Sequence, residues 1–226
     1  MLKTYLTASL LSAALFLPAA AHARPDNRCL RYEDRYGATE QTKFGLLFAK
    51  NTRDGANLYG CLFSTERPYL LAQQSQGLPA RAALNGRYAA YFVVTADDED
   101  AFGFVKGLRV RDLKTGKEVT QAPLLKSVGP SSEPPSPGGA LGPLAGRIVG
   151  RADGAVAWTA GFASGGNPDG SLRAEWEVLT VPQRGGEAQS VDRGQALDPD
   201  SLGKARGETI FYWLNGGRAR SGSLGR

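Results

Sequence analysis

The chain has 226 residues, with one histidine, one methionine and a net charge of +5, and its 42% hydrophobic content is ordinary for one globular domain. Met1 is the initiator and His22 lies in a segment that we expect to be removed, which leaves about 203 residues (226 minus 23), a net charge of +4 and no histidine. This composition excludes histidine-based triads, histidine metal sites and haem ligation through His or Met. The basic residues are scattered rather than clustered, so we expect no nucleic-acid partner.

Residues 1–23 have the pattern of a secretory signal peptide. Lys3 provides the positive start, residues 6–17 form a short apolar run that ends at Pro18, and Ala21-His22-Ala23 is a small-x-small cleavage site. A membrane anchor would need about 20 uninterrupted apolar residues. We therefore expect a secreted or extracytoplasmic protein with no membrane span after cleavage.

Cys29 and Cys61 are the chain's two cysteines. An oxidising compartment favours a disulfide between two such residues in a small exported domain. A redox pair would have C-x-x-C spacing, which these two residues do not have. We expect a structural disulfide between Cys29 and Cys61 near the start of the mature chain.

Residues 24–226 are predicted to form a single all-β domain. Short β-branched or aromatic runs alternate with clusters of Gly, Pro, Asp and Asn, and long segments of helical periodicity are absent. Leu108 and Val110 alternate with Arg109 and Arg111, which predicts strands with one buried face and one wetter face. The expected strands are residues 45–50, 58–63, 88–95, 108–113, 155–160, 176–181 and 209–214.

Internal repeats divide this domain into similar units. A glycine followed by a strand of small and aromatic residues recurs at residues 86–91, 154–158 and 207–213. Residues 110–119, V-R-D-L-K-T-G-K-E-V, predict a tight hairpin in which Asp112 accepts N–H groups of the turn and Gly116 adopts a positive φ.

This hairpin resembles the outer hairpin of a β-propeller blade, and the preceding glycine-led strand resembles an inner strand of such a blade. The chain is thus similar to exported bacterial-type β-propeller-like repeat proteins, mainly over its second and third units. The resemblance implies about four blade-like antiparallel units, near residues 42–76, 83–122, 147–194 and 201–226. A β-sandwich built from the same hairpins is the alternative fold.

Residues 127–146 are rich in Pro, Gly and Ser and are predicted to be a flexible insertion between two units. No G-x-G-x-x-G, Walker or G-x-S-x-G motif occurs, and we expect no cofactor. The acidic run at residues 97–100 has no calcium-loop spacing and is interpreted as a solvated hairpin tip, so no metal site is predicted.

Two groups of charged residues are candidates for function. Arg109 with Arg111, and Arg218 with Arg220, have R-x-R spacing on strands, which directs each pair to one face and makes them candidates for surface binding. Asp198 and Asp200 could form the carboxylate pair of a histidine-free glycan hydrolase, but no catalytic residue is assigned.

Strand aromatics are usually core residues, and Trp158 and Trp213 are expected to be buried. We interpret the sequence as a non-enzymatic binding or interaction module whose partner is an extracellular protein or a polysaccharide. The glycan hydrolase and a structural envelope protein are the alternatives. The sequence does not indicate an oligomeric state.

Overall fold

The structure is a computed structural model that describes residues 26–53, 55–75, 81–95, 104–126, 143–166, 172–205 and 209–225. Within these ranges the chain forms one helix and fifteen strands, and the all-β prediction is confirmed. The predicted signal peptide and the acidic run at residues 97–100 lie outside the described residues. No helix in these ranges is both long enough and apolar enough to cross a bilayer.

The strands form four separate antiparallel sheets, each a meander of consecutive strands. The first sheet contains β1 (Ala38–Gln41), β2 (Gly45–Thr52), β3 (Gly55–Leu62) and β4 (Pro68–Ser75). The second contains β5 (Ala82–Asn85), β6 (Tyr88–Thr95), β7 (Phe104–Asp112) and β8 (Lys117–Pro123). The third contains β9 (Pro143–Gly150), β10 (Val156–Gly166), β11 (Leu172–Val181) and β12 (Gln189–Gly194). The fourth contains β13 (Leu197–Lys204), β14 (Ile210–Asn215) and β15 (Arg218–Ser223).

These four sheets correspond to the four predicted blade-like units. Three of them have four strands and the last has three, and every sheet pairs its strands in chain order. A β-sandwich would distribute its strands over two sheets, so the alternative fold was wrong. The structure is an all-β fold of units that resemble propeller blades.

The hairpin between β7 and β8 has the predicted geometry. Gly116 has a φ of 73°, and its N–H donates to the carbonyl oxygen of Asp112 at 2.7 Å. The Asp112 carboxylate accepts the N–H of Lys114 at 2.9 Å and pairs with Arg87 at 3.1 Å. A residue with a Cβ would be strained at this φ and would also clash with the ring of Tyr69.

A helix that was not predicted precedes the first sheet. Helix α1 (Arg28–Tyr36) begins after Asn27, whose side chain accepts the N–H of Cys29 at 3.0 Å. Tyr32 and Tyr36 stack on Phe48 of β2 with ring centroids 5.0 and 6.0 Å apart. The predicted disulfide between Cys29 and Cys61 is present, and it joins this helix to β3. The helix thereby covers the outer face of the first sheet.

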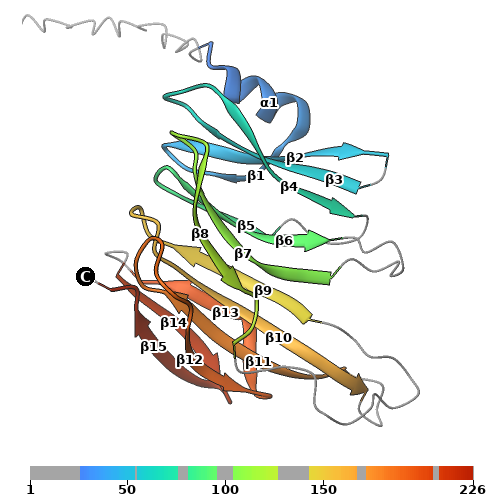
Figure 1. Cartoon of the computed structure of the whole chain (residues 1–226), viewed down its shortest axis with the longest axis vertical. Coiled ribbons are helices and arrows are strands. Elements are labelled where there is room, and N and C mark those ends of the chain that lie inside the picture. Colours follow the sequence, from blue (N-terminus) through green and yellow to red (C-terminus); the bar gives the residue numbers. More distant parts are fainter. Residues whose placement is uncertain are drawn as a thin grey trace, which may run out of the picture.

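The sheets lie face to face in chain order, with α1 at one end and the fourth sheet at the other (Figure 1). Separate hydrophobic clusters fill the interfaces between successive sheets. Trp158 and Trp213 are buried as predicted, and the Trp158 indole donates to the carbonyl oxygen of Leu124 at 2.9 Å. Because the first and fourth sheets lie at opposite ends, the described units do not close into a ring.

Two details of the prediction were wrong. In β7 the predicted alternation is present, with Leu108 and Val110 buried and Arg109 and Arg111 partly exposed. In β10 and β11, however, both faces are largely buried: Glu177 of β11 is fully buried, and its carboxylate accepts the N–H of Lys126 at 3.0 Å. The predicted insertion at 127–146 is also too long, because β9 begins at Pro143, which pairs with Phe162. β9 is an edge strand, and proline is tolerated at the start of an edge strand. Residues 127–142 lie outside the described residues.

Removing the disulfide is expected to destabilise the mature chain. The bond closes a loop of 32 residues, for which loop-closure entropy predicts a loss of about 3 to 4 kcal/mol in the free energy of unfolding. Urea denaturation of the Cys29→Ser/Cys61→Ser double variant against the oxidised wild type measures this loss. Equal midpoints for the two proteins would contradict a stabilising role.

Candidate functional site

The first strands of the four sheets, β1, β5, β9 and β13, meet on one side of the stack. β5 contacts both β1 and β9, and β9 contacts β13. A hollow of about 440 Å³ lies where they meet, and all four sheets contribute to its lining. We call it the inner-strand groove. Its lining residues are Thr39, Glu40, Arg81, Ala82, Ala83, Gly146, Arg147, Ile148 and Asp200.

Asp200 of β13 contacts residues from the second and the third sheet. Its carboxylate pairs with Arg81, which precedes β5, at 3.0 Å, and its carbonyl oxygen accepts a hydrogen bond from Arg147 of β9 at 3.1 Å. The second and fourth sheets are not neighbours in the stack, yet the Arg81–Asp200 pair joins them. The sheets therefore converge at their inner strands, as blades converge toward the axis of a propeller.

The inner strands are edge strands, and neighbouring sheets supply partners for their backbone groups. The Glu40 carboxylate accepts the N–H of Leu84 at 2.9 Å. Lys204 donates to the carbonyl oxygen of Gly150 at 3.0 Å and to the side-chain oxygen of Asn85 at 2.9 Å. These side chains fix the spacing between sheets at the groove.

Burial is the dominant influence on Glu40 and raises the pKa of its carboxyl group. The Leu84 N–H and the charge of Lys204 act in the opposite direction and offset part of that rise. Glu40 therefore holds its proton to a higher pH than an ordinary glutamate. Two guanidinium groups, those of Arg81 and Arg147, and two carboxyl groups, those of Glu40 and Asp200, line the same groove, so its formal charges balance.

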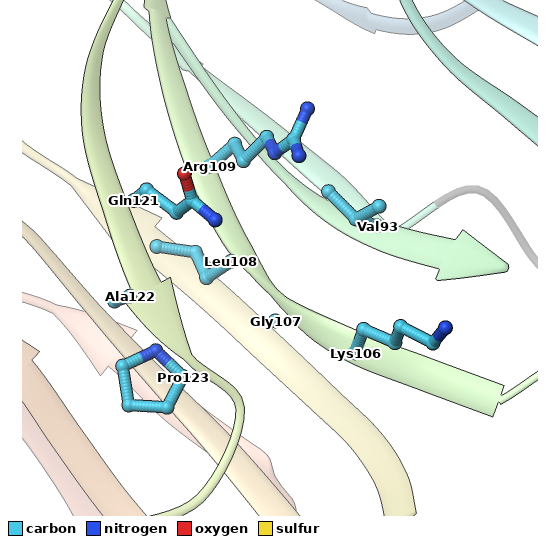
Figure 2. A pocket seen from close by; sticks show the side chains of 8 residues that line it. All are labelled: Val93, Lys106, Gly107, Leu108, Arg109, Gln121, Ala122 and Pro123. Atoms are coloured by element: carbon cyan, nitrogen blue, oxygen red, sulfur yellow. The ribbon is translucent and has the colours of Figure 1, made fainter.

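A second hollow, of about 620 Å³, lies on the second sheet alone (Figure 2). Its lining comes from three adjacent strands, β6, β7 and β8, and includes Lys106, Arg109 and Gln121. Arg109 pairs there with Glu118 at 3.4 Å. One sheet surface provides few directions from which polar groups can converge on a ligand, so the inner-strand groove is the stronger candidate.

The four arginines predicted for surface binding do not form one surface. Arg109 and Arg111 are on the second sheet, and Arg111 donates across the sheet interface to the carbonyl oxygen of Leu70 at 2.8 Å. Arg218 and Arg220 are exposed on β15 of the fourth sheet. The third sheet separates the two pairs, so they cannot bind one compact ligand together.

Of the predicted carboxylate pair, Asp200 lines the groove and Asp198 does not. The Asp198 carboxylate instead accepts the N–H of Asp200 at 3.0 Å within β13. No cluster of three or more metal-ligating side chains occurs in the described part of the chain.

Sequence reasoning missed Glu40, Arg81 and Arg147. They come from three sheets and share no motif or spacing, so only the convergence of the inner strands reveals them. The repeat could have indicated them, because each of the three residues lies in or next to the first strand of its repeat unit.

No family model and no curated protein matches the sequence. The structure is similar to the complex of KlAtg21 with the coiled coil of AgAtg16, with a TM-score of 0.43 and 11% identity over 78% of this chain and 48% of that chain. It is also similar to BamB from Moraxella catarrhalis, with a TM-score of 0.27 and 12% identity over 81% of this chain and 56% of that one. The chain thus spans about half the length of these two structures. Neither TM-score reaches 0.5, and the fold assignment rests on the strand order and sheet packing described above.

The raised pKa of Glu40 predicts how stability depends on pH. The folded state binds this proton more tightly than the unfolded chain, so stability falls as the pH rises from the pKa of Glu40 in the unfolded chain to its raised pKa in the folded state. The cost is complete above the folded pKa and absent below the unfolded pKa. Glu40→Gln keeps an oxygen acceptor for Leu84 without the charge. We expect the variant to gain stability relative to the wild type as the pH rises from 4 to 7, measured by urea denaturation.

Glu187→Gln, at an exposed glutamate outside the groove, is the matched control. If the wild type instead becomes more stable relative to Glu40→Gln as the pH rises, the pKa of Glu40 is not raised in the folded state.

Proposed function

We propose that the protein is an exported, non-enzymatic binding module that holds an acidic segment of a partner protein in the inner-strand groove. The observation that carries this proposal is the convergence of Arg81 and Arg147 from two different sheets on one groove. The Cys29–Cys61 disulfide supports an oxidising, extracytoplasmic location, and export through residues 1–23 is part of the proposal.

The placement of Arg147 in the groove favours an anionic ligand. Asp200 pairs with Arg81, but the contact of Arg147 is to a backbone carbonyl, which leaves its charge unneutralised by that bond. Arg147 is exposed, so an incoming carboxylate can reach its guanidinium. Planar guanidinium groups bind carboxylates through two parallel hydrogen bonds, which gives both strength and orientation.

The lining favours a peptide over a sugar. None of the nine groove residues is aromatic, so the groove offers no flat ring face on which a sugar ring could stack. A volume of about 440 Å³ is at the lower end of ligand pockets and suits one or two acidic side chains of a segment that crosses the groove.

Binding of a fluorescent hexaglutamate peptide to the mature chain tests this function. We expect Arg147→Ala to weaken binding at least tenfold, because hydrogen bonds to charged groups contribute about 1.5 to 3 kcal/mol each. Fluorescence anisotropy at low salt gives the dissociation constants, with a hexaglutamine peptide as the neutral control ligand.

Arg218→Ala is the matched control variant and should bind as the wild type does. If Arg218→Ala and Arg220→Ala abolish binding while Arg147→Ala retains it, the ligand binds at β15 and the groove proposal is wrong. Polygalacturonate, an acidic polysaccharide, is titrated in parallel. If polygalacturonate binds more tightly than hexaglutamate and this binding depends on Arg147, the partner is an acidic polysaccharide and the proposed protein partner is wrong.

The hydrolase alternative stays a prediction and can be tested on the same samples. Release of reducing sugar from polygalacturonate by the wild type, lost in Asp200→Asn, would overturn the non-enzymatic function.

A further inference from the structure

The strand that carries Arg147 is irregular at that residue. β9 and β10 pair on both sides of this point, but between those pairs Gly146 and Arg147 of β9 together face Thr159 of β10. Two residues opposite one form a β-bulge, which bends a strand and can redirect a side chain. The exposed Arg147 lines the groove at this bulge. The direction in which Arg147 projects therefore depends on the contacts that fix the bulge.

The hydroxyl group of Thr159 makes two of these contacts. Its oxygen accepts the backbone N–H of Arg147 at 2.7 Å, and it donates its proton to the carbonyl oxygen of Pro199 in β13, also at 2.7 Å. A hydroxyl has one proton to donate and two lone pairs, so it can form both hydrogen bonds together. Thr159 is fully buried, and the hydroxyl therefore gives the displaced N–H of the bulge a partner inside the protein.

Gly146 leaves the space that this hydroxyl needs. A Cβ at residue 146 would lie 2.1 Å from the hydroxyl oxygen of Thr159 and 2.9 Å from its Cβ and from its carbonyl oxygen. A glycine inside a strand often marks such a close approach. Any larger residue would have to displace the hydroxyl or open the bulge.

The side chain of Arg147 completes a ring of contacts between β9 and β13. Its guanidinium donates to the carbonyl oxygen of Asp200, and the residue before Asp200 is Pro199, which accepts from Thr159. One hydroxyl thus fixes both the backbone from which Arg147 projects and the strand that its side chain contacts. Thr159 itself does not line the groove. We infer that Thr159 is a positioning residue for ligand binding, which acts through Arg147; this inference rests on the function proposed above.

Positioning affects affinity because an arginine side chain has many rotamers. Ordering such a side chain when a ligand binds costs conformational entropy. The bulge and the contact with Asp200 order Arg147 before a ligand arrives. Without the hydroxyl, a smaller fraction of the molecules holds Arg147 in this position, and the apparent dissociation constant rises in inverse proportion to that fraction.

Hexaglutamate binding by Thr159→Val and Thr159→Ser tests this role. Valine has nearly the shape of threonine without the hydroxyl, whereas serine keeps the hydroxyl. We expect Thr159→Val to raise the dissociation constant about fivefold, which corresponds to Arg147 holding its position in roughly one molecule in five. Thr159→Ser should bind as the wild type does. Fluorescence anisotropy at low salt measures both variants.

Thr180→Val is the matched control variant. The buried hydroxyl of Thr180 also donates to a backbone carbonyl oxygen, that of Val156 at 3.2 Å, but this bond lies within the third sheet and away from the groove lining. Both valine variants should lower the melting temperature, because each leaves a buried carbonyl without its hydroxyl partner. Only Thr159→Val should change the affinity for hexaglutamate.

Circular dichroism establishes that each variant is folded. If Thr159→Val does not fold, Gly146→Ala displaces the same hydroxyl and should also weaken binding. A wild type that does not bind hexaglutamate overturns the proposed function and this inference with it. If the wild type binds through Arg147, three results contradict the positioning role alone: equal binding by Thr159→Val, equal weakening by Thr180→Val, or no recovery of affinity in Thr159→Ser.

Discussion

Most of this structure follows from one constraint: the inner sheets are apolar on both faces. In the third sheet, β10 directs Val156 and Trp158 toward the second sheet and Ala157 toward the fourth. A sheet of this kind needs a neighbour on each side, since exposing either face to water would forfeit the stabilisation from its burial. The stacking order is the chain order because each sheet is a local meander joined directly to the next. The first sheet meets the constraint with α1, and the fourth sheet leaves one face exposed.

The same constraint explains why polar chemistry collects at the inner strands. Apolar packing occupies the faces of the sheets, so the edges are the places where backbone groups still need partners. On the inner side those partners come from other sheets. The Glu40 carboxylate accepts the N–H of Leu84, and Lys204 donates to the carbonyl oxygen of Gly150. Each of these hydrogen bonds gives a backbone group of an edge strand a partner and joins two sheets. The polar lining of the groove is thus a consequence of how the edges are closed.

The sequence predicted those features whose causes are local. The hairpin around Asp112 and Gly116, the disulfide and the four repeat units were all predicted, because turn chemistry, cysteine count and alternation act over a few residues. Helix α1 was missed, although Asn27 before it and Gly37 after it are ordinary capping residues. The burial of Glu177 was not predicted, because a partner of its carboxylate, the N–H of Lys126, comes from the segment that follows β8 of the second sheet. Contacts between sheets leave no spacing that a single sequence can display.

The groove shows this limit most clearly, because its polar side chains come from different sheets. Arg147 gives one guanidinium donor to the carbonyl oxygen of Asp200. A guanidinium group has five donors, so this bond fixes the side chain and leaves other donors for a ligand. The carboxyl of Glu40 differs, since it is partly buried and already accepts the N–H of Leu84. Within one groove, Glu40 uses its carboxylate to join two sheets, whereas the exposed Arg147 keeps donors for the ligand that we propose.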